Sequence, residues 1–405
     1  MRRRGLQNIV VCGVTRGTHE LTEFVEDFMM THDHSTIRNR RRFLAGSLLT
    51  LAAPMLGTLS GCSRDRGKRQ LRIFVYAGAH EETMRQVFVP AFEAATGAEV
   101  ILDAGWWDAI AKLKTSPKNQ PAFDLMITDA TQGIPAIRAG LFQTLDATKL
   151  PNVQRLAESV KQSWIWKERH AVPYPDAVMT LAYHRPSLPT EPTRWADLLR
   201  PELRGRVGLY DAYYMSLYTF ACMMVSEANR PGTAQQAIRT QLDEVLRYAK
   251  THRDQVGYWW PTTSAFASQL AQKQYPIGNM QSPEMLQLLA ANPELGAVVP
   301  AEDRAFVQVM WAIPDGTPNA DLAHQAIDWL FADSVQRGLA ERGSATAILP
   351  VAQAMASADP RWASLYPSTE EGLAAIQVYP YDLYAEHGEE ISTFWDREVL
   401  RKAAS

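Results

Sequence analysis

Short apolar runs alternate with longer segments of helical periodicity along most of this chain. Leu71–Tyr76 (LRIFVY) is rich in β-branched and aromatic residues, which predicts a buried strand. Glu81–Ala95 then places apolar residues at helical spacing, and Thr96–Gly97 supplies a typical helix stop. Further strands are predicted at Ala98–Leu102, Phe123–Ile127, Met179–His184, Val207–Tyr210 and within Val298–Ile313. Further helices are predicted at Trp106–Lys114, Gln132–Ala139, Tyr214–Glu227, Ala234–Thr251, Ser264–Lys273 and Asp321–Glu341.

This order of elements predicts an α/β fold with a largely parallel sheet. The body of the chain contains no internal repeat and no low-complexity segment. Its length exceeds what one α/β layer normally needs, so we expect two lobes.

One apolar run near the N-terminus differs from all the others. Arg40–Arg42 precede it, Phe43–Leu59 form it, and the small residues Ser60–Gly61 end it. This layout is typical of an export signal. A membrane-spanning helix needs roughly 20 strongly apolar residues, whereas this run is shorter and is interrupted at Pro54.

Two motifs refine the interpretation of this leader. Asn39–Leu44 (NRRRFL) resembles the twin-arginine export motif, and Leu59–Cys62 (LSGC) resembles a bacterial lipobox. The lipobox implies cleavage before Cys62 and lipidation of that cysteine, which gives a membrane anchor and not a span. We therefore predict a leader at residues 1–62, whose start could lie at Met29 or Met30, and a polar tether at 63–70.

Composition narrows the functional classes. The 405 residues are 46% hydrophobic and 21% charged, with a formal net charge of −3, which does not fit a nucleic-acid-binding protein. The body contains only one cysteine beyond Cys62, so no disulfide framework is available within it. Cys222 lies in the apolar stretch TFACMM and is expected to be a small buried side chain.

A series of short motifs runs in order through nearly the whole body. They are Val75-Tyr76, Phe92–Gly97 (FExxTG), Ala122–Leu125, Gly140–Phe142 with Leu145-Asp146, Pro151–Val153, Val172–Tyr174, Thr193–Leu199, Pro201–Val207 and Ala312–Gly316 followed by Ala323–Leu330. Together they resemble the extracellular solute-binding proteins of ABC importers, in the branch that binds polyamines, ferric iron, thiamine and related solutes.

The resemblance implies a two-lobed periplasmic-binding fold of type II, with the ligand in the cleft between the lobes. Strands near Ala171–Pro175 and Val299–Ile313 would cross between the lobes as a hinge. Residues 71–172 and 312–405 would form the first lobe and 173–311 the second. It further implies a monomer without a cofactor, anchored by lipid in the periplasm or at the cell surface. Its partners would be a small-molecule or ferric ligand and an ABC permease in the inner membrane.

The loop after the first strand should face the cleft, and it carries Tyr76 and His80. Similarity to the iron-binding members makes His80, Asp129 and Tyr214 a candidate metal set if the ligand is ferric iron, which prefers hard oxygen donors. The paired tyrosines of those members are absent, because Gly278–Ser282 stands in their place. Tyr213, Tyr214 and Tyr218 could compensate or could be packing residues.

An organic cation would instead need aromatic faces and carboxylates. Candidate rings are Trp106 in the pair Trp106-Trp107, and Trp259 and Trp260, which we expect in an extended loop because Pro261 follows. Similarity to polyamine binders predicts a Trp and an Asp at the positions of Val307 and Val309, and this difference counts against spermidine or putrescine. The identity of the solute stays open at this stage.

The two alternative functions are an exported enzyme and a binding protein that serves a sensor. An exported enzyme would need a nucleophile elbow, a metal-binding His pair or a phosphate-binding loop, and the body shows none of these motifs. The histidines of the body are scattered singly. A binding protein that reports to a sensor would look the same in sequence as one that serves an importer.

Overall fold

The computed structural model describes residues 68–401, which belong to one compact unit. The predicted leader, including the twin-arginine motif and Cys62, lies outside the described residues. Within residues 68–401 no helix has the length and apolarity that a membrane span requires.

The first part of the sheet is built from parallel strands that alternate with helices. β1 (Gln70–Tyr76) lies between β2 (Glu99–Gly105) and β3 (Leu125–Asp129), and it runs parallel to both. The helices of this part are α1 (Ala79–Thr83), α2 (Val89–Thr96), α3 (Ala109–Thr115) and α4 (Ala130–Arg138). A π-helical turn joins α1 to α2. β3 is fully buried and the apolar residues of β1 are buried, so these two strands form the centre of this layer.

The second part of the sheet repeats this arrangement. β5 (Val207–Tyr210) runs parallel to both β6 (Val256–Trp260) and β7 (Ile277–Gln281). The helices and the short strand of this part are α7 (Tyr213–Glu227), α8 (Ala234–Thr240), α9 (Leu242–His252), α10 (Thr263–Ala271), α11 (Ser282–Ala291) and β8 (Leu295–Val298). Cys222 is buried in α7 and is not in a disulfide, as predicted.

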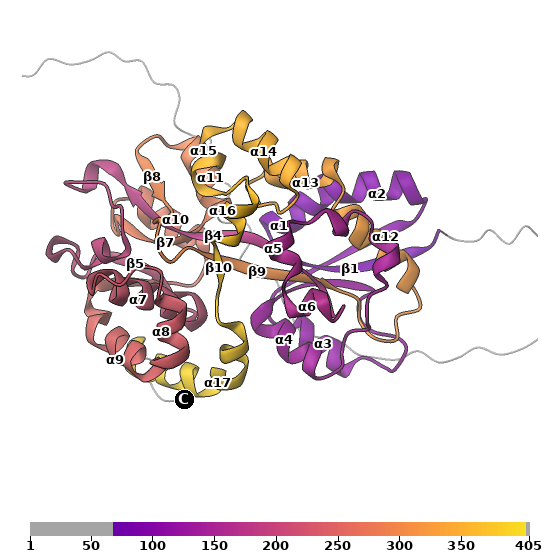
Figure 1. The fold of residues 1–405 in the computed structure, drawn as a ribbon, viewed down its shortest axis with the longest axis horizontal. Coiled ribbons are helices and arrows are strands. Elements are labelled where there is room, and N and C mark those ends of the chain that lie inside the picture. Colours follow the sequence, from indigo (N-terminus) through magenta and orange to yellow (C-terminus); the bar gives the residue numbers. More distant parts are fainter. Residues whose placement is uncertain (1–67, 402–405) are drawn as a thin grey trace, which may run out of the picture. The chain divides into compact units, whose positions relative to one another are not determined.

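Two long antiparallel strands connect the parts. β4 (Val172–His184) pairs with β9 (Ala305–Ala312) in its first half and with β7 and β8 in its second half, and β9 also pairs with β3. Figure 1 shows β4 and β9 side by side between the two groups of parallel strands. The crossing strands expected near Ala171–Pro175 and Val299–Ile313 are therefore present.

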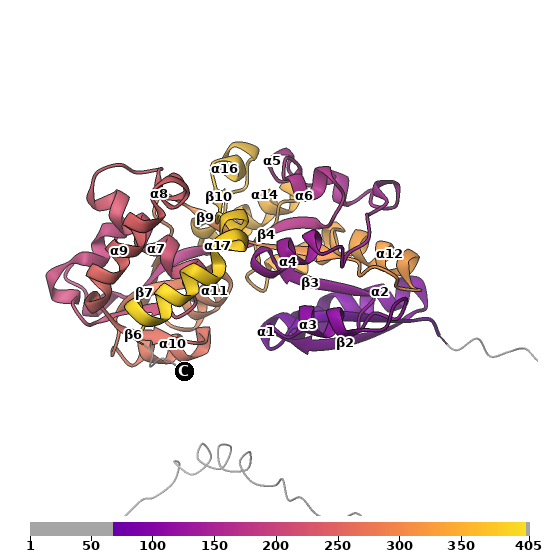
Figure 2. The same cartoon turned by 90° about the horizontal axis from the view of Figure 1, so that it is seen from below.

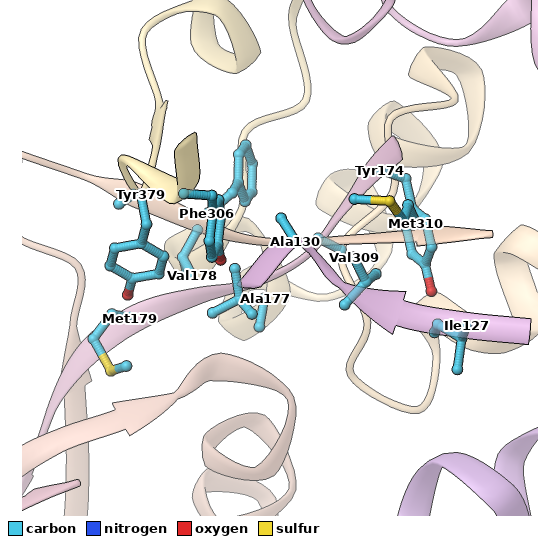
Figure 3. Close-up of a cluster of buried hydrophobic side chains, with 14 of the residues drawn as sticks. Ile127, Ala130, Tyr174, Ala177, Val178, Met179, Phe306, Val309, Met310 and Tyr379 are labelled. Atoms are coloured by element: carbon cyan, nitrogen blue, oxygen red, sulfur yellow. The ribbon is translucent and has the colours of Figure 1, made fainter. Parts of the chain in front are cut away.

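The pairing of β4 with β9 contains a bulge at Asp176. Tyr174 pairs with Val309 and Pro175 with Gln308, but Ala177 pairs with Val307, so Asp176 is the extra residue. Figure 3 shows the apolar side chains that pack where the strands run together, among them Tyr174, Ala177, Val178, Phe306, Val309 and Met310.

The C-terminal segment touches elements from both parts. It comprises α16 (Glu370–Ala374), the short strand β10 (Gln377–Val378), which pairs with β9, and α17 (Tyr381–Phe394). α17 contacts both α4 and α7 (Figure 2), and Asp382 forms a bidentate pair with Arg239 of α8. The remaining helices are α5 (Glu158–Lys161), α6 (Trp164–Lys167), α12 (Ala320–Leu330), α13 (Asp333–Ala340), α14 (Leu349–Ala358) and α15 (Pro360–Leu365).

Several expectations need correction. The sheet is mixed, because the crossing strands pair antiparallel with their neighbours. The predicted helix Ala234–Thr251 is divided at Gln241, whose backbone leaves the helical region (φ −141°, ψ 37°). The predicted helix Asp321–Glu341 is divided where Phe331 turns inward and packs its ring 5.7 Å from that of Tyr174. In each case a tertiary contact or a local turn overrides a continuous helical pattern.

The expected loop around Trp259 and Trp260 is also wrong. These residues end strand β6, which pairs with β5, so the ladder hydrogen bonds determine their backbone. Pro261 follows the last strand residue and therefore does not interrupt the pairing.

Candidate functional site

The carboxyl ends of three neighbouring parallel strands meet at one edge of the sheet. Tyr76 is the last residue of β1, Asp129 is the last residue of β3, and Trp106 directly follows β2. Because β1 pairs with both β2 and β3, the three side chains are brought together although they are far apart in sequence. Ligands of open α/β sheets bind at such edges.

An aromatic cluster lies at this edge. Tyr76 stacks on Trp106, with ring centroids 5.5 Å apart and an interplanar angle of 19°. The His80 ring meets Tyr76 edge-on at 5.8 Å, and it lies 6.3 Å from the Trp311 ring on β9. The first strand, the helix after it and a crossing strand therefore share one patch of rings.

The cluster continues onto the second part of the protein. Trp107 meets Tyr214 of α7 edge-on at 6.1 Å. Tyr214 in turn contacts Tyr210 at 6.1 Å and Tyr213 at 6.3 Å, and Tyr210 lies 4.5 Å from Trp260. We call the whole set the aromatic cluster: Tyr76, His80, Trp106, Trp107, Tyr210, Tyr213, Tyr214, Trp260 and Trp311.

Asp129 lies beside this cluster and also begins α4. Its Oδ1 accepts hydrogen bonds from the backbone N–H groups of Thr131 (2.7 Å) and Gln132 (3.3 Å), as an N-cap residue does. Burial raises the pKa of the Asp129 carboxyl, and these hydrogen bonds oppose the rise. Its charge, in turn, helps to raise the pKa of Tyr213 and Tyr214, after burial, which has the largest effect.

Three predicted site residues carry buried polar atoms that lack a hydrogen-bond partner within the described part of the chain. They are the Tyr76 hydroxyl, His80 Nδ1 and Trp260 Nε1. Burial lowers the pKa of His80 to about 4, so the imidazole is neutral at physiological pH. Burial, followed by the charge of Asp129, raises the pKa of Tyr76 well above its usual value. The rings of Tyr76 and His80 are only 5.8 Å apart, and unsatisfied buried groups that gather in this way are a feature of sites whose ligand completes the hydrogen bonding.

Two buried acidic residues that the sequence analysis missed lie on the hinge strand β4 and at the start of α11. Asp176 lines a small recess of about 10 Å³ under the crossing strands, together with His80, Met84, Tyr174, Trp311, Leu330, Gln336, Leu339, Ser344 and Ala345. Burial raises the pKa of Asp176 to about 6. Burial, with a smaller contribution from the Asp176 charge, raises the pKa of Glu284 at the start of α11 to about 7.

The spacing of residues in the sequence offered little evidence that these two acids belong to the site. Asp176 directly follows the predicted crossing segment, but Glu284 lies on a distant helix whose position depends on the pairing of β4 with β7.

The structure places two predicted residues away from the cluster. Trp259 packs against Phe220 at 6.4 Å and against Trp395 at 5.7 Å. It points to the opposite side of β6 from Trp260, because successive strand residues alternate between faces. Tyr218 packs edge-on against Tyr379 at 4.8 Å, so it is a packing residue.

The candidate metal set receives no support from the geometry. Among residues 68–401 no group of three or more His, Cys, Asp or Glu side chains is placed to hold a metal ion. Moreover, burial raises the pKa of Tyr214 well above its usual value, which disfavours the phenolate that would bind ferric iron.

The two faces of the β4–β9 pair differ in chemistry. Tyr174, Val309 and Trp311 point to one side, which we call the front face and which carries the recess. Pro175, Phe306 and Gln308 point to the back face, where they line a larger cavity of about 550 Å³. The other residues around that cavity include Ile134, Trp164, Arg239, Tyr379, Tyr381 and Asp382.

Comparison with known proteins places this geometry in a family. Residues 88–366 match the profile of the bacterial extracellular solute-binding proteins. The gamma-aminobutyric acid-binding protein of Pseudomonas aeruginosa is 20% identical over 356 residues, which cover 83% of this chain and 93% of that protein.

Solved structures agree in fold. An ABC transporter substrate-binding protein from Bradyrhizobium japonicum superposes with a TM-score of 0.68 at 16% identity, covering 81% of this chain and 98% of the other. The spermidine/putrescine-binding protein PotD from Streptococcus pneumoniae gives a TM-score of 0.64 at 17% identity, covering 81% and 100%.

These proteins share the two-lobed periplasmic-binding fold, so the predicted fold class is confirmed. The family consists of transport components that bind a small molecule for an ABC importer and do not catalyse its conversion. The chain belongs to the bacterial extracellular solute-binding protein family of ABC importers.

Proposed function

We propose that this solute-binding protein captures a small organic cation, specifically an amine-bearing solute, and presents it to its permease. The observation that carries the proposal is the charge of the site. Acidic side chains and aromatic faces surround it, and within residues 68–401 no Lys, Arg or protonated His is among the groups that shift the pKa of Tyr76, Asp129, Asp176 or Tyr214.

The physical reason is the cost of burying a carboxylate without a partner. A buried negative charge needs either a proton or a cation beside it. A bound ammonium group would provide that cation, and the electron-rich faces of Tyr76 and Trp106 would attract it further. A solute that carries only a negative charge would meet repulsion from Asp129.

The named relatives are consistent with an amine. One is named for binding gamma-aminobutyric acid and another for binding spermidine or putrescine. These molecules differ in length and net charge, but each carries an ammonium group. A shared preference for that group supports the same class of ligand for this chain.

Capture would proceed by hinge closure. We propose that residues 71–172 and 312–405 move against 173–311 about β4 and β9, as in other two-lobed binding proteins. The contact of Trp107 with Tyr214 joins the two sides of the aromatic cluster. A solute that touches both sides stabilises the closed form by the contacts that only this form offers.

We further propose that the mature protein is a monomer held at the membrane by lipid on Cys62, with residues 63–70 as its tether. The test is fractionation of cells that express the wild type or Cys62→Ser. The proposal predicts the wild type in the membrane fraction and the variant in the soluble fraction. Equal partitioning of the two would contradict it.

Isothermal titration of the purified protein tests the ligand class. The panel contains spermidine, 4-aminobutanoate, thiamine, ferric citrate and a neutral sugar. We expect binding of an amine, and a loss of about tenfold or more in Asp129→Asn, because asparagine still caps α4 but removes the charge. Binding of ferric citrate alone would contradict the proposal, as would binding of the sugar alone.

A further inference from the structure

Asp176 and Glu284 lie on either side of one contact between the hinge strand and α11. The ladder of β4 with β7 ends where Met179 lies opposite Gln281, and the backbone N–H of Val178 then donates to Ser282 Oγ at 2.9 Å. Residues 343–345 touch both sides of this contact, because the backbone N–H of Ala345 donates to the Asp176 carbonyl at 2.9 Å and Gly343 lies against Pro283, the neighbour of Glu284. The two acids are therefore close enough for the Asp176 charge to contribute to the raised pKa of Glu284.

Neither carboxylate is satisfied by another residue. Within the described part of the chain, neither side chain forms a hydrogen bond or an ion pair with another residue, and Glu284 Oε2 is buried without a partner. Asp129 differs, because two backbone N–H groups already donate to it. The two acids therefore have more capacity left for a ligand than the acid at the strand ends.

The neighbouring groups do not supply a positive charge. His80 lines the recess with Asp176, but its lowered pKa keeps it neutral, and its Nδ1 has no partner. The Tyr366 hydroxyl already forms hydrogen bonds with Ser282 Oγ (2.7 Å) and with the carbonyl of Gly343 (2.5 Å). Burial raises its pKa most, and the charges of both acids raise it further.

The size of the recess limits what can enter. Its volume of about 10 Å³ is close to the space that a single water molecule requires. An ammonium group is of similar size and can donate three hydrogen bonds. A carboxylate, a sugar ring or a flat aromatic group would not fit beside Tyr174 and Trp311.

We propose that Asp176 and Glu284 together bind the ammonium group of the solute, while the aromatic cluster holds its apolar part. This inference rests on the proposed function, since it names the residues that recognise the amine. It makes the two acids specificity-determining residues that join the hinge strand β4 to the start of α11. Because β4 pairs with β7 and β7 leads directly into α11, the sheet itself holds the two acids in place.

The test is titration of the purified protein with spermidine and with 4-aminobutanoate, in the wild type, Asp176→Asn and Glu284→Gln. We expect each variant to bind about 30-fold or more weakly. The thermal midpoint of each unliganded variant should be equal to or higher than that of the wild type, because a buried charge has been removed. A purely structural role would lower affinity and thermal midpoint together.

Glu244→Gln is the matched control, because Glu244 is exposed on α9 and should not affect binding. If both acid variants bind as tightly as the wild type, the subsite is overturned while the proposed function stands. If the wild type binds neither amine, the proposed function and the subsite are both overturned. Saturable binding of calcium chloride alone that both variants abolish would show an inorganic cation site and overturn the ammonium assignment.

Discussion

The front and back faces of the β4–β9 pair invite comparison, because the same two strands line a recess on one side and a cavity on the other. The back cavity is about 550 Å³ and the front recess only about 10 Å³. The charged groups at the back, Arg239 and Asp382, neutralise each other through two hydrogen bonds of 2.8 and 2.7 Å. At the front, Asp176 has no such partner among the described residues.

The comparison shows that the larger cavity need not be the one whose side chains most need a ligand. The unpaired groups around the back cavity are the neutral hydroxyls of Ser159 and Tyr379. An unpaired buried hydroxyl costs far less free energy than an unpaired buried carboxylate. A ligand would therefore contribute the most stabilisation by binding at the smaller front recess.

The largest effect on stability is expected where the loop between α13 and α14 approaches the start of α11. Gly343 has φ +107°, and a Cβ atom there would lie 2.7 Å from the carbonyl oxygen of Pro283, next to Glu284. Gly343→Ala should lower the free energy of unfolding by about 3 kcal/mol, from backbone strain and the clash. Urea denaturation measures this value.

Gly140→Ala is the matched control for this substitution. Gly140 also has a positive φ (+68°), but no atom lies within 4 Å of its added Cβ. Gly140→Ala should lower the free energy of unfolding by about 1 kcal/mol, from backbone strain alone. Equal costs for the two variants would mean that the approach to Pro283 is not tight.

Loss of a front-face ring should have the next largest effect. Tyr76→Ala removes the ring that stacks on Trp106 and should weaken amine binding about 100-fold, since a desolvated cation–π contact and apolar packing are lost together. Gln308→Ala, on the back face, should stay within twofold. Isothermal titration gives both values, and a reversed order would contradict the assignment of the faces.

The pH dependence of stability should come mainly from the front face. The pKa values of Asp176 (about 6) and Glu284 (about 7) are raised above those of unfolded carboxyls. A raised carboxyl pKa stabilises the folded protein at pH values below the unfolded pKa, near 4, and this contribution is lost as the pH rises through 6 to 7.

The double variant Asp176→Asn, Glu284→Gln should therefore gain on the order of 5 kcal/mol relative to the wild type between pH 4.5 and 8. Thermal denaturation of the unliganded proteins at both pH values measures the gain. His80 is present in both proteins, so its own titration contributes equally to each. A constant difference between the proteins would show that the two acids are not buried and uncompensated.

The back-face ion pair should affect stability without affecting binding. Arg239→Ala breaks the pair with Asp382, which is partly exposed, so about 1 kcal/mol of stability should be lost. Amine affinity should remain within twofold. A tenfold loss of affinity would show that the back cavity takes part in solute binding.

The smallest effect is expected for a ring at the rim of the cluster. The Trp107 side chain is 49% exposed and meets Tyr214 edge-on. Trp107→Ala should weaken amine binding about threefold, as one edge-to-face contact is lost. Trp164→Ala is the control, because Trp164 is similarly exposed but lines the back cavity, and titration should show no change for it.

Much of the fold and part of the site could be read from local sequence. Tyr76 is predicted because it ends the strand Leu71–Tyr76, and Asp129 because it follows the strand Phe123–Ile127 at the place of a carboxylate in the iron-binding relatives. The carboxyl ends of parallel strands meet at one edge, which brings the two residues together. The crossing strand was found because Val172–Tyr174 forms part of a motif run. Each of these inferences needs only the neighbouring residues and a general rule of sheets.

The remaining features depend on pairing between distant strands. Asp176 and Glu284 are brought near each other by the pairing of β4 with β7 and by the contact of Val178 with Ser282, and hydrophobic periodicity does not specify such contacts across so long a separation. The opposite roles of Trp259 and Trp260 follow from the alternation of side chains within β6, which the predicted extended loop does not impose. The break at Gln241 carries no Gly or Pro as a signal.

Native mass spectrometry of the purified protein with an equimolar mixture of spermidine, 4-aminobutanoate, thiamine and ferric citrate tests the central claim most directly. The account predicts a single 1:1 complex with a solute that carries a positively charged nitrogen. It also predicts that Asp176→Asn and Glu284→Gln largely lose this complex, while Gln308→Ala keeps it. A ferric adduct as the main species, or an amine complex that survives both front-face variants and disappears in Gln308→Ala, would contradict the account.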